Sequence, residues 1–208
     1  EGLGVLILKR LDDAQRDGDR VYAVIRGMGS SSDGRGNAIY APSAKGQTKA
    51  LRNAYRDAEV TPQSIELIEA HCTGTKVGDA AEVSALQEVY GEGTEAQRHE
   101  GTKGADTETS HIEDRTSHIA APWCAIGSVK SMVGHTKAAA GAAGLIKAAM
   151  ALHRRVLPPT IKVGRPLAQF DDPSSPVYVN TEARPWVRPR DGGPRRAAVS
   201  AFGFGGSN

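Results

Sequence analysis

Alanine and glycine, whose side chains are no larger than a methyl group, make up ten of the eighteen residues of 137–154, KAAAGAAGLIKAAMALHR. This composition favours a helix that ends near Arg154, because Pro158 and Pro159 cannot continue it. We expect Thr136 or a neighbour to cap its start. Small side chains let other backbone segments approach closely, and surface helices seldom have this composition. The segment therefore predicts a helix buried at the centre of a layered fold.

Short β-rich runs alternate with helical patterns over the rest of the chain. The runs predicted to be strands are residues 3–8, 21–25, 64–70, 123–128, 177–180 and 197–201. A helix follows Ser43 and reaches Ala58, with its apolar residues on one stripe. Asp79 and Glu82 resemble a capping box at the start of a further helix, which runs to about Tyr90. This alternation predicts an α/β fold whose strands are buried by helices on both sides.

Two polar stretches are expected to lie outside these elements. Residues 12–19 are rich in turn-forming residues and should connect the first two strands. Residues 91–121 are charged and lack apolar periodicity, so a long exposed loop is predicted there. The chain also begins within an apolar run and stops in a glycine-rich turn, and we therefore expect it to be part of a longer polypeptide.

Charge and cysteine content exclude several classes of function. The 26 basic and 24 acidic residues are interspersed, and the net charge of +2 leaves no polybasic face for nucleic acid or for an anionic membrane. The first apolar run is too short to span a membrane. Only two cysteines, Cys72 and Cys124, are present, which favours a reducing cytoplasm over a disulfide scaffold. The histidines of the 91–121 loop match no compact ligand spacing, so no metal site is predicted.

Three separated segments carry residues suited to catalysis. They are EAHCTGT at 69–75, GSVKSMVGHTKAAAG at 127–141 and AFGFGGSN at 201–208. Together they supply His71 at the end of a predicted strand, Lys130, His135 and a glycine-rich turn. No cysteine, serine or threonine lies in a recognisable nucleophile turn. The chain therefore supplies half of an active site.

In order and spacing, EAHCTGTKVGD, GSVKSMVGHTKAAAGAAGLIK, VLPPT and SAFGFGGSN resemble the second half of a β-ketoacyl synthase, or ketosynthase, domain. The segments KAAAGAAGLIKAAMALHRRVLPPTIKV and NTEARPW are most similar to ketosynthases of the iterative polyketide type, including those of enediyne and polyunsaturated fatty acid synthases. The resemblance implies a thiolase-like layered αβαβα fold, here its C-terminal half with a mixed sheet and a buried alanine-rich helix. Residues 1–40 would be the end of the N-terminal half and the crossover, and residues 41–208 would form the C-terminal half.

The resemblance also implies a reaction and its partners. Such an acyltransferase catalyses decarboxylative Claisen condensation of an acyl-cysteine thioester with malonyl on acyl carrier protein, in polyketide or fatty acid chain elongation. The substrate is carried on the phosphopantetheine of that protein, and no metal or diffusible cofactor is needed. The intact parent would be a cytoplasmic homodimer. Because the nucleophilic cysteine lies outside this chain, the chain alone would be inactive.

The same motifs imply the residues of the reaction centre. His71 and His135 would be the catalytic histidines, which hydrogen-bond the malonyl thioester carbonyl and stabilise the enolate, and Lys130 would be the lysine of the same site. Preorganised donors at such an oxygen contribute about 3 kcal/mol each. The helix that follows His135 should keep that ring neutral through its dipole. Thr73 and Thr75 would hold the phosphopantetheine arm.

Further residues would support this centre. The amide of Phe204, in a turn that Gly203 and Gly205 make tight, would donate to an oxyanion, and the ring of Phe204 would gate the pocket. Lys130 would orient a neighbouring carboxylate, for which Glu69 is the candidate.

Two alternatives stay open. One is a non-catalytic partner subunit like the chain-length factors, which resemble ketosynthases but lack the nucleophile; retention of both histidines and the lysine speaks against it. The other is an acyltransferase or hydrolase that uses Cys72, which would need a thiol of low pKa. Cys72 stands where the family usually has glycine, so we expect it to cost some stability if the backbone there prefers glycine.

Overall fold

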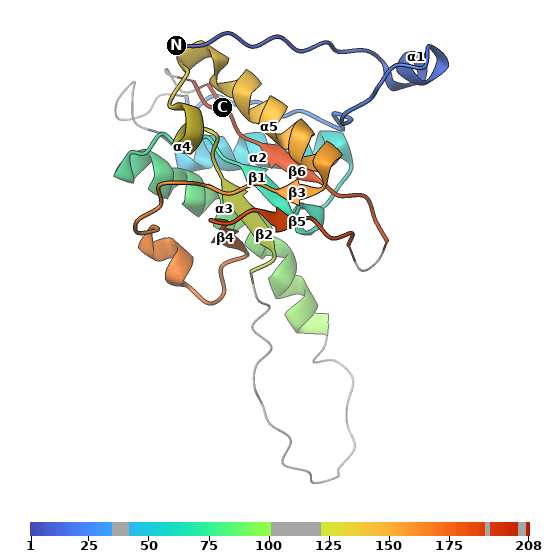
Figure 1. Cartoon of the computed structure of the whole chain (residues 1–208). Coiled ribbons are helices and arrows are strands. Elements are labelled where there is room, and N and C mark those ends of the chain that lie inside the picture. Colours follow the sequence, from blue (N-terminus) through green and yellow to red (C-terminus); the bar gives the residue numbers. More distant parts are fainter. Residues whose placement is uncertain (35–41, 101–121, 190–191, 204–206) are drawn as a thin grey trace, which may run out of the picture.

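A computed structural model describes residues 1–34, 42–100, 122–189, 192–203 and 207–208, with residues 93–100 described by their backbone only. A four-stranded sheet in the order β4-β2-β1-β6 lies at its centre (Figure 1). Its strands are β1 (Leu67–Glu69), β2 (Cys124–Gly127), β4 (Val177–Val179) and β6 (Ala197–Val199). The four strands lie within four of the predicted runs, and the α/β class is confirmed.

The main sheet is parallel in the described residues, so the expectation of a mixed sheet is not met there. All three pairings between neighbouring strands are parallel. A helix lies between β1 and β2 and again between β2 and β4 along the chain, and a parallel pair requires such a crossover. Antiparallel pairing in the described part is confined to two isolated bridges and to a separate sheet of β3 (Val156–Leu157) and β5 (Arg184–Pro185).

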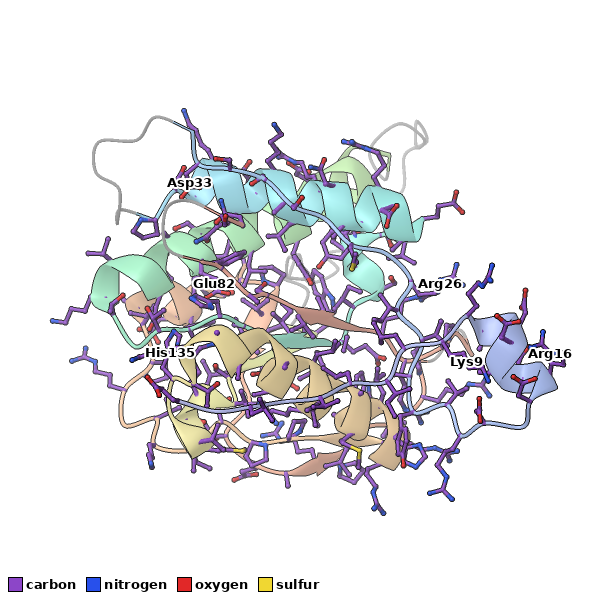
Figure 2. The ribbon with its side chains drawn as sticks, turned by 90° about the horizontal axis from the view of Figure 1, so that it is seen from above. Lys9, Arg16, Arg26, Asp33, Glu82 and His135 are labelled. Carbon is purple, nitrogen blue, oxygen red and sulfur yellow. The ribbon has the colours of Figure 1, made fainter. Side chains whose placement is uncertain are left out.

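Helices cover both faces of the sheet (Figures 1 and 2). On one face lie α2 (Ala44–Ala58) and α3 (Lys76–Glu100), and on the other lies α5 (Ala140–Arg154). Successive side chains of a strand point to opposite faces, so Ile68 of β1 packs in the α2 and α3 core and Leu67 packs in the α5 core. The result is the three-layer arrangement expected of an α/β fold.

The helix after Ser43 has its predicted ends. Ser43 Oγ accepts a hydrogen bond from the N–H of Gly46 at 3.3 Å, which is the geometry of an N-terminal cap. The apolar stripe of α2 includes Leu51 and Tyr55, which are buried. The hydroxyl of Tyr55 lies 2.5 Å from that of Tyr90 on α3. This stripe therefore joins the two helices into one layer.

The start of α3 differs from the predicted capping box. The helix begins at Lys76, because Thr75 Oγ1 accepts the N–H of Gly78 at 3.2 Å and so occupies the cap position. Asp79 and Glu82 consequently lie inside the helix, where their carboxylates bind the turn that follows β1.

The far end of α3 corrects the predicted loop at 91–121. The helix continues to Glu100 and projects beyond the sheet at the bottom of Figure 1. No other described element lies beside this end of the helix in Figure 1, and a helix end without such a neighbour needs no apolar stripe to signal it. Residues 101–121 lie outside the described residues. No helix in the described part of the chain is long and apolar enough to cross a membrane.

The alanine-rich helix α5 ends at Arg154, as predicted. It starts at Ala140 after a short 3-10 turn, η2 (Lys137–Ala139), and Thr136 provides no side-chain cap. Four small residues are buried: Ala140, Gly144, Ala148 and Ala151. Ile146 is 40% exposed. The helix is therefore buried on one face, rather than on all sides as its composition led us to expect.

The predicted strands at 3–8 and 21–25 are wrong for this structure. Both segments pair with no strand among the described residues, and Leu3 and Ile7 are each 94% exposed. The first segment crosses beside α5 (Figure 2), where a Cβ on Gly4 would lie 3.0 Å from the methyl group of Ala142. A strand needs a neighbouring strand to satisfy its backbone, and the described residues place none beside either segment.

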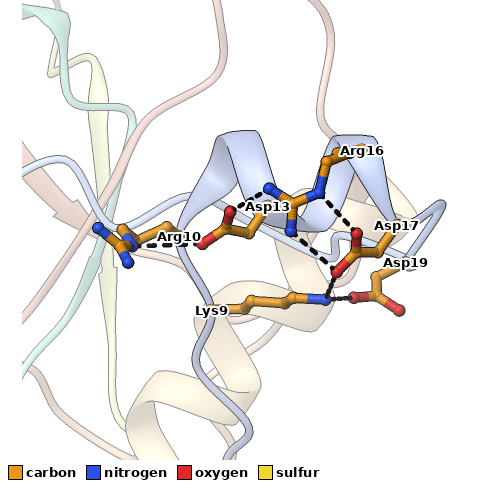
Figure 3. Close-up of polar contacts among 6 residues, drawn as sticks. All are labelled: Lys9, Arg10, Asp13, Arg16, Asp17 and Asp19. Carbon is orange, nitrogen blue, oxygen red and sulfur yellow. Dashed lines mark hydrogen bonds and ion pairs between the residues drawn. The ribbon is translucent and has the colours of Figure 1, made fainter.

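A short helix, α1 (Leu11–Arg16), replaces part of the turn predicted at 12–19. Ion pairs among charged side chains draw this stretch into a bend (Figure 3): Lys9 pairs with Asp17 and Asp19, and Arg16 pairs with Asp13 and Asp17. A pair between residues three apart, such as Arg16 and Asp13, supports a helical turn. Exposed ion pairs contribute little to stability, so the cluster shapes the bend more than it stabilises the fold.

A groove runs along the outer edge of β6. It has a volume of about 450 Å³ and is lined by residues 23–29, by one side of α2 and by one side of α5. Among the described residues no strand of the main sheet pairs with this edge. The groove therefore separates the extended residues 21–28 from the sheet.

Candidate active site

The histidines and the lysine singled out by the sequence lie at one edge of the central sheet. His71 follows β1, Lys130 begins α4 (Lys130–Val133) after β2, and Phe202 follows β6. Because these parallel strands are neighbours, their carboxyl ends meet at the same edge. The ring centroids of His71 and His135 lie 5.7 Å apart, with the ring planes at 89°.

His71 is held as a neutral ring. The N–H of Phe202 donates a hydrogen bond to His71 Nδ1 at 3.3 Å, and the Phe202 ring lies 5.5 Å away. A ring nitrogen that accepts carries no proton, so the proton of the neutral ring is on Nε2. Burial is the largest cause that lowers the pKa of His71 to about 4, and the charges of Lys130 and His135 contribute to the same shift. The ring is therefore neutral at pH 7, with Nε2–H as its donor.

His135 has the same tautomer when neutral, through a different backbone group. The N–H of Lys137 donates to His135 Nδ1 at 3.0 Å, so Nε2 carries the proton of the neutral ring. The helix α5 begins only at Ala140, with η2 in between, so its dipole acts from farther away than we expected. Local backbone geometry, rather than the dipole, sets which nitrogen of this ring donates.

A buried carboxylate that the sequence analysis did not assign to the site holds the His71 backbone. Glu82 is 3% exposed. Its Oε1 accepts the N–H of His71 at 2.7 Å, and its Oε2 accepts the N–H of Cys72 at 2.8 Å. Burial raises the pKa of Glu82 to about 7, against the opposing effect of these two hydrogen bonds. Figure 2 shows Glu82 and His135 at the same end of the molecule.

The helical period contained a signal for Glu82. Thr75, Asp79 and Glu82 follow one another at spacings of four and three residues, so they share one helix face. Asp79 Oδ1 accepts the N–H of Gly74 at 3.2 Å, and Thr75 caps the helix. This face of the helix therefore holds the backbone of the turn at 71–75. The predicted capping box concerned only the start of the helix and gave Glu82 no partner in that turn.

Glu69 binds a different lysine from the one we expected. Lys147 Nζ lies 2.7 Å from Glu69 Oε2, and Glu69 Oε1 accepts the N–H of Val129 at 2.5 Å. Burial raises the pKa of Glu69, and the charge and hydrogen bond of Lys147 oppose that effect. Lys130 acts on Glu69 only as a charge without a hydrogen bond. Nothing in the local sequence signalled Lys147, since it lies on the alanine-rich helix.

Lys130 lies half-buried within the field of several carboxylates. Burial lowers the pKa of its ammonium group, whereas the charges of Glu82 and Glu69 raise it. In return, the Lys130 charge helps to lower the pKa of His71. The lysine is therefore coupled electrostatically both to the carboxylates and to the first histidine.

The two threonines expected to bind phosphopantetheine lie at the start of α3. Thr73 Oγ1 and Thr75 Oγ1 are 3.0 Å apart, and both residues are exposed. Because Thr75 also caps α3, its hydroxyl has a structural role as well.

The glycine-rich turn is described only at its two ends. The N–H of Gly203 donates to the carbonyl oxygen of Ser207 at 2.8 Å, which closes the turn. Phe204 and Gly205 lie outside the described residues, so the oxyanion and gating roles stay predictions.

Cys72 has a backbone conformation that suits glycine. Its φ of 33° lies in the left-handed region, which side chains other than glycine seldom adopt. The backbone at this position therefore prefers glycine, which is the condition under which we expected Cys72 to lower the stability of the fold. Burial raises the pKa of the Cys72 thiol, and Glu82 adds to that effect. The thiol therefore lacks the low pKa that the acyltransferase or hydrolase alternative requires.

No group of three or more histidine, cysteine, aspartate and glutamate side chains in the described residues is arranged to hold a metal ion. What the described site does contain is a pair of imidazole N–H donors, a half-buried ammonium group and two buried carboxylates at one sheet edge. The imidazole donors and the ammonium group can stabilise negative charge on an oxygen atom, and the carboxylates hold the backbone that carries them.

Comparison with known proteins assigns this arrangement to a family. The family model for the C-terminal domain of β-ketoacyl synthases matches residues 22–103 and 98–164. The chain belongs to this family, as its motifs predicted.

Proteins of similar sequence include polyunsaturated fatty acid and polyketide synthases, of which this chain matches a small part. A polyunsaturated fatty acid synthase polypeptide of Thraustochytrium is 45% identical over 211 residues, covering 100% of this chain and 7% of that protein. The polyketide synthase PksL of Bacillus subtilis is 43% identical over 208 residues, covering 100% of this chain and 4% of that protein.

A solved structure supports the same fold. The ketosynthase from module 6 of the bacillaene synthase of Bacillus subtilis is 42% identical with a TM-score of 0.78, covering 96% of this chain and 32% of that one. The chain thus spans about a third of that ketosynthase and a few per cent of the two curated relatives. The predicted ketosynthase fold is confirmed.

Proposed function

We propose that this chain is the C-terminal half of a ketosynthase domain in a polyketide or polyunsaturated fatty acid type of synthase, and that it serves decarboxylative Claisen condensation. The observation that carries the proposal is the pair of histidines, in each of which Nδ1 accepts a backbone N–H. The synthases named above support the substrate class, since they are polyketide and polyunsaturated fatty acid synthases.

The proposed reaction starts from a malonyl thioester on acyl carrier protein. The bond between its terminal carboxylate and the neighbouring carbon breaks, carbon dioxide leaves, and the electron pair moves onto the thioester as an enolate. That carbon then attacks the carbonyl carbon of an acyl-cysteine thioester. As the new carbon–carbon bond forms, the cysteine leaves as a thiolate. The cysteine would belong to a part of the domain outside this chain.

The two histidines would stabilise the enolate. Their rings are 5.7 Å apart, which allows both Nε2–H groups to reach one thioester oxygen. Because the tautomers are fixed beforehand, the donors need no reorganisation when negative charge develops. Each such donor contributes about 3 kcal/mol, so the loss of one should slow decarboxylation about 100-fold. Lys130 would add positive charge beside them.

The remaining roles follow from the same proposal. Thr73 and Thr75 would hold the phosphopantetheine arm of acyl carrier protein, and the amide of Phe204 would donate to the oxyanion of the acyl-cysteine. Residues 1–40 would be the end of the N-terminal half and the crossover, and residues 41–208 would form the C-terminal half. The exposed apolar side chains near the start of the chain support this division. The intact parent would be a cytoplasmic homodimer, and this chain alone would be inactive.

The test is the rate of carbon dioxide release from malonyl-acyl carrier protein by the intact synthase. Replacing His71 or His135 by alanine should lower that rate about 100-fold, whereas the exposed Lys49→Met variant should keep it. If the unmodified synthase releases no carbon dioxide, the chain-length-factor-like alternative takes the place of this proposal. If it does so and both alanine variants retain the rate, the histidines are not the donors.

A further inference from the structure

A buried ion pair links the alanine-rich helix to the sheet edge that carries the histidines. Lys147 of α5 lies with its Nζ 2.7 Å from Glu69 Oε2, and the two side chains are 10% and 3% exposed. Glu69 is the last residue of β1 and lies two residues before His71. Removing two charges from water is costly, so a buried pair is weak evidence for stability. Its place beside the histidines suggests another role.

The packing around the pair leaves room for it. A Cβ on Gly144 would lie 3.1 Å from Glu69 Cγ. A Cβ on Gly127 would lie 3.7 Å from Lys147 Nζ and 2.1 Å from Thr160 Oγ1. The distance to Lys147 is an ordinary contact, whereas those to Glu69 and Thr160 are closer than side chains normally come, so Gly144 leaves room for Glu69 and Gly127 leaves room for Thr160.

The carboxylate of this pair also binds the turn that carries the other site residues. Glu69 Oε1 accepts the N–H of Val129, the residue that precedes α4. Lys130 is the first residue of α4, and its carbonyl oxygen accepts the N–H of Gly134 at 3.0 Å. His135 follows directly. One carboxylate therefore connects the strand of the first histidine with the turn of the second.

We propose that Lys147 is a positioning residue of the ketosynthase site, an inference that rests on the proposed function. Its ammonium group holds the Glu69 carboxylate in place, and that carboxylate fixes the backbone at Val129, where the turn with Lys130 and His135 begins. The Glu69 carboxylate forms its ion pair with Lys147. Lys130 makes no hydrogen bond to Glu69 and acts on it only through its charge. Lys147 itself touches no reacting atom in this scheme.

Three variants of the intact synthase distinguish two roles of Lys147: holding Glu69 so that it fixes the Val129 backbone, or only neutralising the buried charge of Glu69. Lys147→Met removes the charge and leaves Glu69 buried without its partner. The pair Glu69→Gln with Lys147→Met is neutral and keeps an oxygen for the Val129 N–H. The pair Glu69→Ala with Lys147→Met is equally neutral but lacks that oxygen. Lys49→Met, at an exposed lysine within α2, is the matched control.

The readout is malonyl decarboxylation, with kcat and KM measured separately and scaled to the folded fraction from circular dichroism. We expect Lys147→Met to lower kcat about 100-fold with KM unchanged, as displacement of catalytic groups by about 1 Å does. The variant with glutamine should recover to within about tenfold of the unmodified rate, and the variant with alanine should stay low. Lys49→Met should change neither constant.

Three results would overturn the inference. They are an unchanged kcat in Lys147→Met, equal kcat values in the two neutral double variants, and unfolding of every Lys147 variant, which would mean a structural role alone. If only Lys147→Met fails to fold, the two neutral double variants decide, since neither has an unpaired buried charge. His71→Ala is assayed alongside: if it keeps the rate, the proposed function fails, whereas if it loses the rate and the double variants are alike, only the role of Lys147 fails.

Discussion

Glu82→Gln should remove the pH dependence that this position gives to the stability of the fold. The carboxylate accepts the N–H groups of His71 and Cys72 from a site that is 3% exposed, and burial raises its pKa to about 7. In the unfolded chain the pKa of a glutamate is close to 4.5. The folded state therefore binds the proton more tightly, so the glutamate protein loses stability as pH rises from about 4.5 to about 7.

The size of that loss follows from the two pKa values. At about 1.4 kcal/mol per pKa unit, it amounts to about 3 kcal/mol in the free energy of unfolding. Glutamine does not titrate, but it offers one oxygen to two N–H donors, which costs about 2 kcal/mol at every pH. The glutamine variant should therefore be the less stable protein near pH 5 and should match or exceed the unmodified one near pH 8.

Urea unfolding of the domain that contains this chain, at several pH values between 4.5 and 8, measures this difference directly. The stability of Glu82→Gln relative to the unmodified protein should rise by about 3 kcal/mol across the range. Glu88→Gln, at an exposed glutamate of the same helix, controls for a change in surface charge. If the difference between Glu82→Gln and the unmodified protein stays flat with pH, the burial of this carboxylate does not act as we argue.

Three further changes test other parts of the site. Cys72→Gly should raise the free energy of unfolding by about 1 kcal/mol, because it relieves a φ of 33°; an unchanged melting temperature would mean that the thiol's packing offsets the strain. Thr75→Ala should lower helix stability by about 1 kcal/mol, whereas Thr73→Ala keeps the cap, so equal melting temperatures for the two variants would contradict the capping role. Nitrogen-15 NMR should find the His71 ring neutral with its proton on Nε2 down to about pH 5, since its pKa is lowered to about 4; a ring that titrates near 6.5 would refute the assignment. Because this pKa is depressed by folding, the ring's contribution to stability is lost as pH falls from about 6.5 to about 4.

Local patterns predicted the elements that owe their form to local causes. The apolar stripe and the serine cap located the helix at 44–58, and the two prolines located the end of α5. The β-rich runs at 64–70 and 123–128 contain β1 and β2, and their carboxyl ends bring the histidines together. That convergence was predictable because neighbouring parallel strands all end at the same edge.

The features that the sequence did not reveal depend on distant partners. Glu82 looked like a capping residue because its two hydrogen-bond donors lie in a different segment, before the helix starts. No role was predicted for Lys147, since its partner Glu69 is far away along the chain. The runs at 3–8 and 21–25 have the composition of strands, but pairing requires an adjacent strand, which composition cannot report.

The absence of a side chain at Gly144 should tie three positions of the chain together in evolution. Glu69 occupies the space that a larger residue at position 144 would need, and Lys147 is present to balance the charge of Glu69. A larger side chain at position 144 would press on Glu69 and should favour a smaller residue at position 69, and a lysine at position 147 would then have no carboxylate to bind. Substitutions at these three positions should therefore appear together across the family, so that a relative either keeps the whole buried ion pair with its glycine or loses all three residues.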